Sequence, residues 1–156
     1  MIASVHLSCG AASALFIQKY IPLKFKIESR CFCAFFAGLA SHVAVDAWPH
    51  WEYTQTGSKL WAILLVETLF VSWALLGTSL GRSRFVAGII FFGMVGGAVP
   101  DLSLMIWEKW FFWQPLLYFH FVMHIFHSVL PFFTIGPVLQ VILAGAAIIY
   151  VQLKSA

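Results

Sequence analysis

Long apolar stretches separated by short polar connections run through almost the whole chain. We mark six of them, each near the length of about 20 residues that a helix needs to cross a bilayer. Their approximate bounds are residues 2–18, 31–48, 60–80, 85–99, 112–130 and 132–153. Pro49 and Pro100 are expected to end the second and fourth stretches, because proline lacks a backbone donor. The pattern predicts an all-α fold, a polytopic transmembrane bundle of about six spans in a single domain, residues 1–156. A shallower hairpin around Pro131 is the alternative for the last two stretches.

The composition leaves too little polar surface to cover a water-soluble globule. Of the 156 residues, 62% are hydrophobic and 10% are charged, whereas soluble domains carry about 25% charged residues. The apolar stretches nearly exhaust the chain, so no soluble catalytic domain is expected beside them. Residues 1–18 lack the basic start of a signal peptide and are expected to form a retained first helix.

Basic residues predict the orientation of the chain. The first connection carries Lys19, Lys24, Lys26 and Arg30, and the third carries Arg82 and Arg84. Because cytoplasmic loops are enriched in Lys and Arg, both connections are expected in the cytoplasm of a bacterial-type inner membrane. The N-terminus is then non-cytoplasmic, as is the C-terminus if all six stretches cross. Charged and apolar residues alternate over residues 19–30, so this segment is expected to lie on anionic membrane lipids.

Ionisable side chains within apolar helices are costly, and those present need a reason. His42 and Asp46 are four residues apart, which places both on one helix face. His120, His124 and His127 form a second stripe of the same kind in the fifth stretch. Imidazole combined with carboxylate is a ligand set that borderline divalent metals favour, and zinc is the metal we expect.

The predicted depths bring these groups into one leaflet. In the predicted orientation, ionisable residues of five stretches lie toward the non-cytoplasmic ends of their helices. We therefore predict a site for one or two zinc ions, with the ligands His42, Asp46, Asp101, His120 and His124. His6 and His50 are additional candidate ligands. The alternative role for a single intramembrane His, and for Glu67, is a hydrogen bond between helices.

Four short motifs resemble a known family. They are His6 with Gly10, residues 41–51 (SHVAVDAWPHW), residues 96–101 (GGAVPD) and residues 124–128 (HIFHS). Small bacterial inner-membrane proteins of the YdjM/YbcI type, regarded as membrane-bound metal-dependent hydrolases, and related small membrane proteins carry similar motifs. Ser103 stands where the family pattern has a second acid, and Ile125 where it has Arg. The resemblance implies a membrane-embedded metal site with hydrolytic activity.

The predicted function is metal-dependent hydrolysis of a lipid-like or otherwise amphiphilic substrate. Glu67 or His127 would be the general base, because one proton acceptor must remain outside the metal's ligands. A membrane di-iron hydroxylase is an alternative, but the six histidines include no adjacent pair. A non-enzymatic metal carrier, or a subunit with a membrane protein partner, is the third interpretation. The chain has no phosphate-binding loop and no nucleic-acid-binding signature, so no nucleic acid partner is expected.

Overall fold

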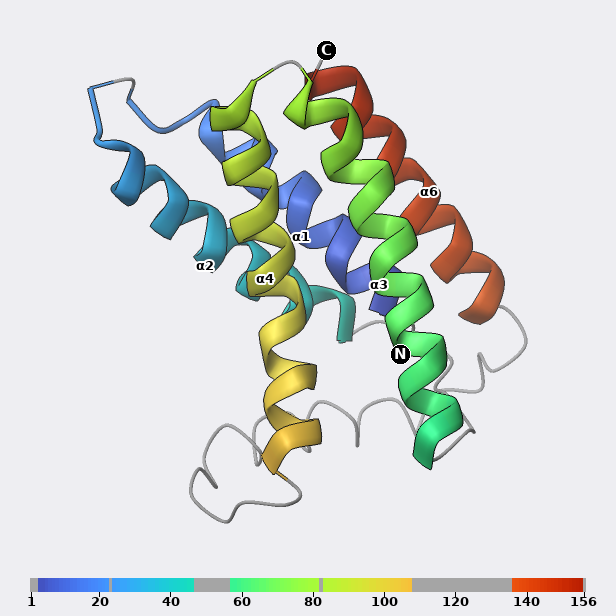
Figure 1. Ribbon diagram of the computed structural model, residues 1–156. Coiled ribbons are helices and arrows are strands. Elements are labelled where there is room, and N and C mark those ends of the chain that lie inside the picture. The colour runs from blue at the N-terminus through green and yellow to red at the C-terminus, as the bar shows by residue number, and fades with distance from the viewer. Residues whose placement is uncertain (1–2, 23, 47–56, 82, 108–135, 156) are drawn as a thin grey trace.

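The computed structural model describes residues 3–22, 24–46, 57–81, 83–107 and 136–155 (Figure 1). Within these residues the chain forms helices and no strand. The helices are α1 (Ala3–Gln18), α2 (Ile27–Asp46), α3 (Gly57–Leu80), α4 (Arg84–Trp107) and α6 (Gly136–Ser155). The all-α prediction is therefore confirmed for the part of the chain that the structure describes. The predicted fifth stretch, residues 112–130, lies outside it.

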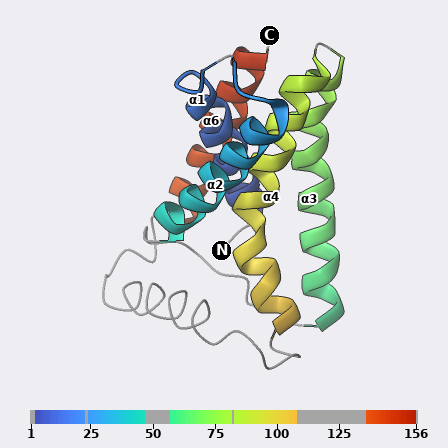
Figure 2. The same cartoon turned by 90° about the vertical axis from the view of Figure 1, so that its left-hand side faces the viewer.

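The helix α1 is the central element of the bundle. It packs against each of the other four helices, and α4 packs in turn against α2 and α3. Figures 1 and 2 show α4 between α2 and α3 in both views. The helices α1, α2 and α4 therefore meet one another pairwise, and the candidate site lies where they meet.

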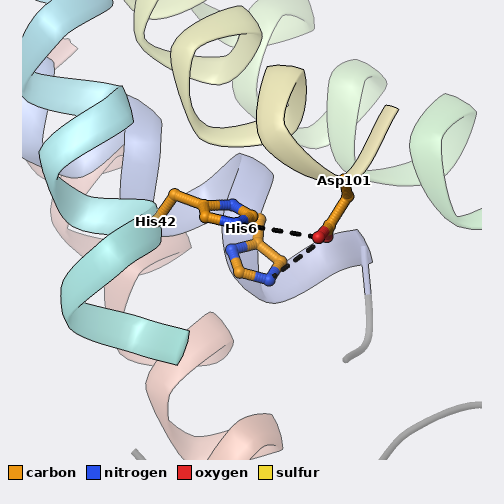
Figure 3. A group of neighbouring side chains, drawn as sticks. All are labelled: His6, His42 and Asp101. Atoms are coloured by element: carbon orange, nitrogen blue, oxygen red, sulfur yellow. Dashed lines mark ion pairs between the residues drawn. The ribbon is translucent and has the colours of Figure 1, made fainter. Parts of the chain in front are cut away.

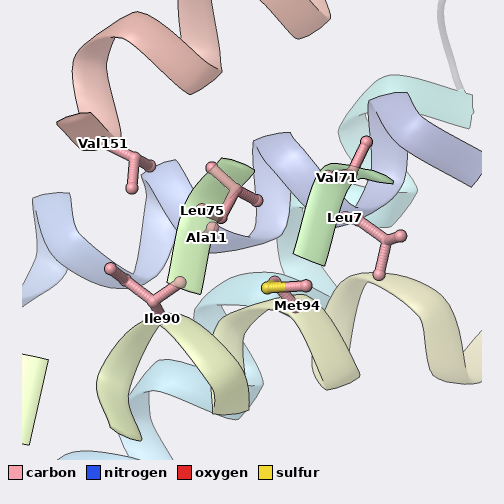
Figure 4. Packing of buried hydrophobic residues seen from close by; sticks show 7 residues of the cluster. All are labelled: Leu7, Ala11, Val71, Leu75, Ile90, Met94 and Val151. Atoms are coloured by element: carbon pink, nitrogen blue, oxygen red, sulfur yellow. The ribbon is translucent and has the colours of Figure 1, made fainter. Parts of the chain in front are cut away.

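The main apolar core joins α1, α3, α4 and α6 (Figure 4). Its buried residues are Leu7, Ala11, Val71, Leu75, Ile90, Met94 and Val151. On α1, α3 and α4 these residues come in pairs four apart, which is the spacing of one helix face. The core therefore holds α3 and α6 against α1, and it leaves other faces of both helices exposed.

Glycines set the distance between α4 and its two neighbours α1 and α2. A Cβ added at Gly97 of α4 would clash with the carbonyl oxygen of His6, and one at Gly38 of α2 with that of Gly93. A Cβ at Gly10 of α1 would meet the Gly93 carbonyl as well. Small residues let helix backbones approach closely. The three helices therefore cross in direct backbone contact.

The sequence prediction that Pro100 ends the fourth helix is wrong. The helix α4 continues through Pro100 to Trp107. A proline inside a helix removes one hydrogen bond to the carbonyl four residues earlier, but the remaining bonds of the following turns are kept. Because α4 continues, Asp101 is part of a helix and not of a connection after it.

Two helical stretches are long and apolar enough to cross a membrane, Gly57–Gly77 and Arg84–Ser103. Two further apolar helices, Ala3–Gln18 and Val138–Lys154, are shorter. Only 11% of the apolar window in Gly57–Gly77 is buried, whereas the core helix of a soluble protein is mostly buried. The exposed residues of α3 include Trp73, which is 72% exposed. An apolar helix with so small a buried share is typical of contact with a membrane or a partner protein.

The helix directions differ from those of six alternating spans. Val5 of α1 shares a buried cluster with Ala144 of α6. Further along both helices, Nζ of Lys19 lies 5.9 Å from the ring centroid of Tyr150. The helices α1 and α6 therefore run in the same direction. In six alternating spans the first and last helices would instead run in opposite directions.

Candidate metal centre

His6, His42 and Asp101 come together where α1, α2 and α4 cross (Figure 3). Each helix contributes one of these side chains, and their ligand atoms all lie within 4.8 Å of one another. Asp46 follows His42 by one turn on α2 and approaches both imidazole rings. The side chains of His6, His42 and Asp46 are at most 4% exposed, whereas that of Asp101 is 34% exposed. Three members of the group are therefore buried, and the group is accessible beside Asp101.

The carboxylates of Asp46 and Asp101 both face the Nε2 atoms of the two histidines. The Nε2 atom of His6 lies 3.3 Å from Oδ1 of Asp46 and 3.4 Å from Oδ2 of Asp101. The Nε2 atom of His42 lies 2.9 Å from Oδ2 of Asp46 and 3.6 Å from Oδ1 of Asp101. Metal–ligand bonds of about 2.0 Å in a tetrahedral zinc site place the ligand atoms about 3.3 Å apart. The four separations lie on both sides of that value, and His6, His42 and Asp101 could hold one metal ion.

The backbone of α4 determines which nitrogen of His42 faces the carboxylates. The Nδ1 atom of His42 lies 2.8 Å from the carbonyl oxygen of Gly97. A carbonyl oxygen only accepts hydrogen bonds, so Nδ1 carries the proton and donates it. In the neutral ring, Nε2 then presents a lone pair to the carboxylate oxygens. Metal-binding histidines are commonly oriented in this way, by a backbone carbonyl that receives the other ring N–H.

The two imidazole rings are stacked, with centroids 4.0 Å apart and an angle of 24° between their planes. Two charged rings in this position would repel each other, which disfavours protonation of both rings. Both nitrogens of His6 are buried and make no well-formed hydrogen bond within the described residues. A cation at the centre of the group would bind Nε2 of His6 and balance two carboxylate charges that are otherwise costly in this setting.

Three of the predicted ligands, His42, Asp46 and Asp101, meet in this group. The fourth member is His6, which the sequence suggested only as an additional candidate. His6 has no acidic residue or second histidine one turn away along its own helix. It reaches the carboxylates because α1 crosses α4 at Gly97. The remaining predicted histidines lie outside the residues that the structure describes; they are His50, His120, His124 and His127.

Glu67 lies on α3 and is not a member of this group. It is half-buried and stands one turn before Val71 of the main core. Val71 in turn shares that core with Leu7, the residue after His6. Glu67 is therefore on the helix that covers the His6 end of α1, and its role as a general base stays a prediction.

No family model, no curated protein and no solved structure matches this chain. The resemblance to membrane-bound metal-dependent hydrolases of the YdjM/YbcI type therefore stays a prediction from short motifs. The geometry of the four side chains is what indicates a metal site.

Proposed function

We propose that this chain is an integral membrane protein that binds a zinc ion at His6, His42 and Asp101 and hydrolyses an amphiphilic substrate. The observation that carries the proposal is the meeting of two Nε2 atoms with two carboxylates, at separations of 2.9 to 3.6 Å. These groups come from three helices, and glycine contacts hold those helices together. A hydrogen-bond network alone would not need two acceptor-only carboxylates around two stacked rings.

Residence in the membrane is supported by the outer faces of the helices. The helix α3 exposes Val66, Phe70 and Trp73, and α6 exposes Val141 and Leu153, each by more than 60%. Contact of such apolar faces with lipid chains is favourable, whereas their exposure to water is costly. The predicted count of about six spans and the predicted orientation, with the N-terminus on the non-cytoplasmic side, belong to this proposal.

The ligand set suits hydrolysis because it leaves room at the metal. Two imidazoles and one carboxylate occur in catalytic zinc sites, which keep a fourth position for water or substrate. A zinc ion bound there would polarise the scissile group and supply a water that loses its proton near neutral pH. Asp46 contacts both rings and would keep them in place. Glu67 or His127 would take the proton from water.

An amphiphilic substrate is supported by what surrounds the accessible side of the group. Asp101 is its most exposed member, and the next residue along α4 is Leu102, which is 47% exposed. A molecule that reaches Asp101 with a polar group would therefore place its apolar part against the exposed surface of α4. Lipids and other amphiphiles have this construction.

The test combines metal analysis with activity on the purified protein in detergent. We expect one equivalent of zinc in the wild type and little in Asp101→Asn or His6→Ala. The matched control is Glu28→Gln, which removes an exposed carboxylate from the first turn of α2 and should leave the zinc in place. Wild-type protein without stoichiometric metal, prepared without chelators, would contradict the proposal.

A metal carrier is the second candidate, and Asp46 is the observation in its favour. If Asp46 is a fourth ligand, the coordination sphere is closed, as it is in non-catalytic zinc sites. Hydrolysis of ester, amide or phosphodiester amphiphiles that stops with a chelator and returns with zinc would support the enzyme. Bound zinc without hydrolysis of any of them would support the carrier.

A further inference from the structure

The end of the bundle opposite the candidate metal centre is strongly basic. The helices α1, α3 and α6 end there, and α2 and α4 begin there, as Figures 1 and 2 show. The cations described at this end are Lys19, Lys24, Lys26, Arg30, Arg84 and Lys154. Glu28 is the one acid among the described residues of this end. Toward the other end the described charged residues are two acids, Asp46 and Asp101, and one base, Lys59.

Arg30 is held in a defined orientation at this end. Its Nε donates a hydrogen bond of 2.8 Å to Oε1 of Gln18, and Nε2 of Gln18 donates one of 3.1 Å to the carbonyl oxygen of Arg30. The guanidinium carbon lies 4.5 Å from the ring centroid of Phe85 on α4. Residues of α1, α2 and α4 thus position the guanidinium group. Because Gln18 uses the Nε–H, a ligand would meet the two terminal amino groups, which match the oxygens of a phosphate.

Two further cations lie next to Arg30. Lys26 directly precedes α2, and the backbone N–H of Arg30 bonds to its carbonyl oxygen. Lys26 therefore lies one turn before Arg30, on the same side of the helix start. Arg84 directly precedes Phe85, the residue under the guanidinium group. Both side chains are exposed. An anion bound to Arg30 would therefore lie in the field of several positive charges.

Exposed apolar side chains alternate with these cations. Tyr20 is 67% exposed, Phe25 44% and Ile27 52%. Along α2 they are followed by Phe32 and Phe36, which are 64% and 47% exposed and contact each other with ring centroids 4.6 Å apart. Lysines interleaved with exposed aromatic and aliphatic residues are typical of segments at a membrane surface, where the apolar groups enter the lipid and the cations meet headgroups.

We propose that the basic end of the bundle binds the headgroup of an anionic phospholipid, with Arg30 on the phosphate and Lys24 and Lys26 beside it. The exposed pair Phe32 and Phe36 is covered by the lipid chains. A nucleic acid or an acidic soluble protein would match the charge but would leave Phe25, Ile27 and Phe32 facing water. The inference rests on the membrane residence of the proposed function and not on its metal site.

Native mass spectrometry of the protein in detergent measures the binding of phosphatidylglycerol against phosphatidylcholine. We expect clear preference for the anionic lipid, weakened by added salt. Each lysine near an anionic lipid surface contributes a factor of about five in affinity. The double variant Lys24→Gln/Lys26→Gln should therefore lose about 25-fold. Both side chains are exposed, so the variant should keep its fold. The matched control is Lys59→Gln, an exposed lysine at the start of α3 at the other end, which should bind as the wild type does.

Arg30→Lys tests the guanidinium group itself, because it keeps the charge and removes the two-pronged donor. A loss of affinity in Arg30→Lys supports the geometry proposed for Arg30, and unchanged affinity overturns it. Equal binding of both lipids, or equal losses in Lys59→Gln and the double variant, overturns the lipid proposal. Displacement of the lipid by inorganic phosphate at equal concentration also overturns it, in favour of a site for free anions. Zinc content, measured on the same samples, reports separately on the proposed function.

Discussion

The Nδ1 atom of His42 on α2 donates a hydrogen bond of 2.8 Å to the carbonyl oxygen of Gly97 on α4. The same glycine lies against the backbone of His6, where a Cβ would clash with the His6 carbonyl oxygen. Gly97 therefore orients the ring of His42 through a hydrogen bond, and its lack of a side chain lets the backbone of His6 approach α4. Asp101 follows Gly97 by one helical turn and completes the group. Close packing at Gly97 and the chemistry of the site are thus properties of the same helix crossing.

Gly97→Ala is expected to separate α1 from α4 and to lower both stability and zinc binding. The new methyl group would meet the His6 carbonyl, and inserting a methyl group into a packed interface costs about 1–3 kcal/mol. The matched control is Gly88→Ala on the same helix, where a Cβ would meet no atom within 4 Å. Unfolding in denaturant and zinc content measure the two effects. If both variants behave alike, the close contact at Gly97 does not position the site.

Asp46→Asn is expected to weaken zinc binding without abolishing it. Asp46 lies 2.9 Å from His42 and 3.3 Å from His6, so we assign it the orientation of the rings in the three-ligand site. Loss of such a supporting group lowers metal affinity by roughly 10- to 100-fold. Competition with a fluorescent zinc chelator measures the change. Complete loss of zinc, equal to that in Asp101→Asn, would make Asp46 a ligand and would favour the closed site of a carrier.

Periodicity along single helices predicted part of this site. His42 and Asp46 share a face because they are four residues apart, and that relation depends on α2 alone. His6 reaches them only because α1 crosses α4 at Gly97, a contact that no pattern within one helix reveals. Pro100 does not end α4, because the loss of one backbone hydrogen bond is not enough to end a helix packed in a bundle. The direction of α6 was also not predictable, since counting apolar stretches does not show which of them cross.

Glu67→Gln is expected to keep the fold and the zinc and to lower turnover. A positioned general base contributes roughly 10²- to 10⁴-fold to the rate, and the amide keeps the shape of the side chain while removing the proton acceptor. Zinc content and the rate of hydrolysis, measured together, separate the roles. Loss of zinc would make Glu67 a ligand and leave His127 as the better base. An unchanged rate would return Glu67 to a structural contact between helices.

A reporter fused at Ser83, in the basic α3–α4 connection, is expected to read as cytoplasmic, and one at Gly57 as non-cytoplasmic. The structure adds a third position. Ser155 ends α6 at the same end of the bundle as Ser83, so a reporter after Ser155 should agree with Ser83. Six alternating spans would give the opposite result at the C-terminus. The three fusions therefore separate orientation from helix direction.

The reporter readings also show which side of the membrane the proposed metal site faces. His6 is near the start of α1, Asp46 ends α2, and Asp101 is within the last two turns of α4, so all three lie toward the side of the bundle on which α3 begins. A non-cytoplasmic reporter at Gly57 would therefore place the proposed metal site on the outer side of the membrane, where the proposed substrate would reach it from the outer leaflet. If Ser83 and Gly57 exchange their readings, the site faces the cytoplasm, and the basic end meets the outer leaflet. That result would contradict both the orientation and the assignment of Lys24 and Lys26 to anionic lipid, because such lipids are concentrated on the cytoplasmic side.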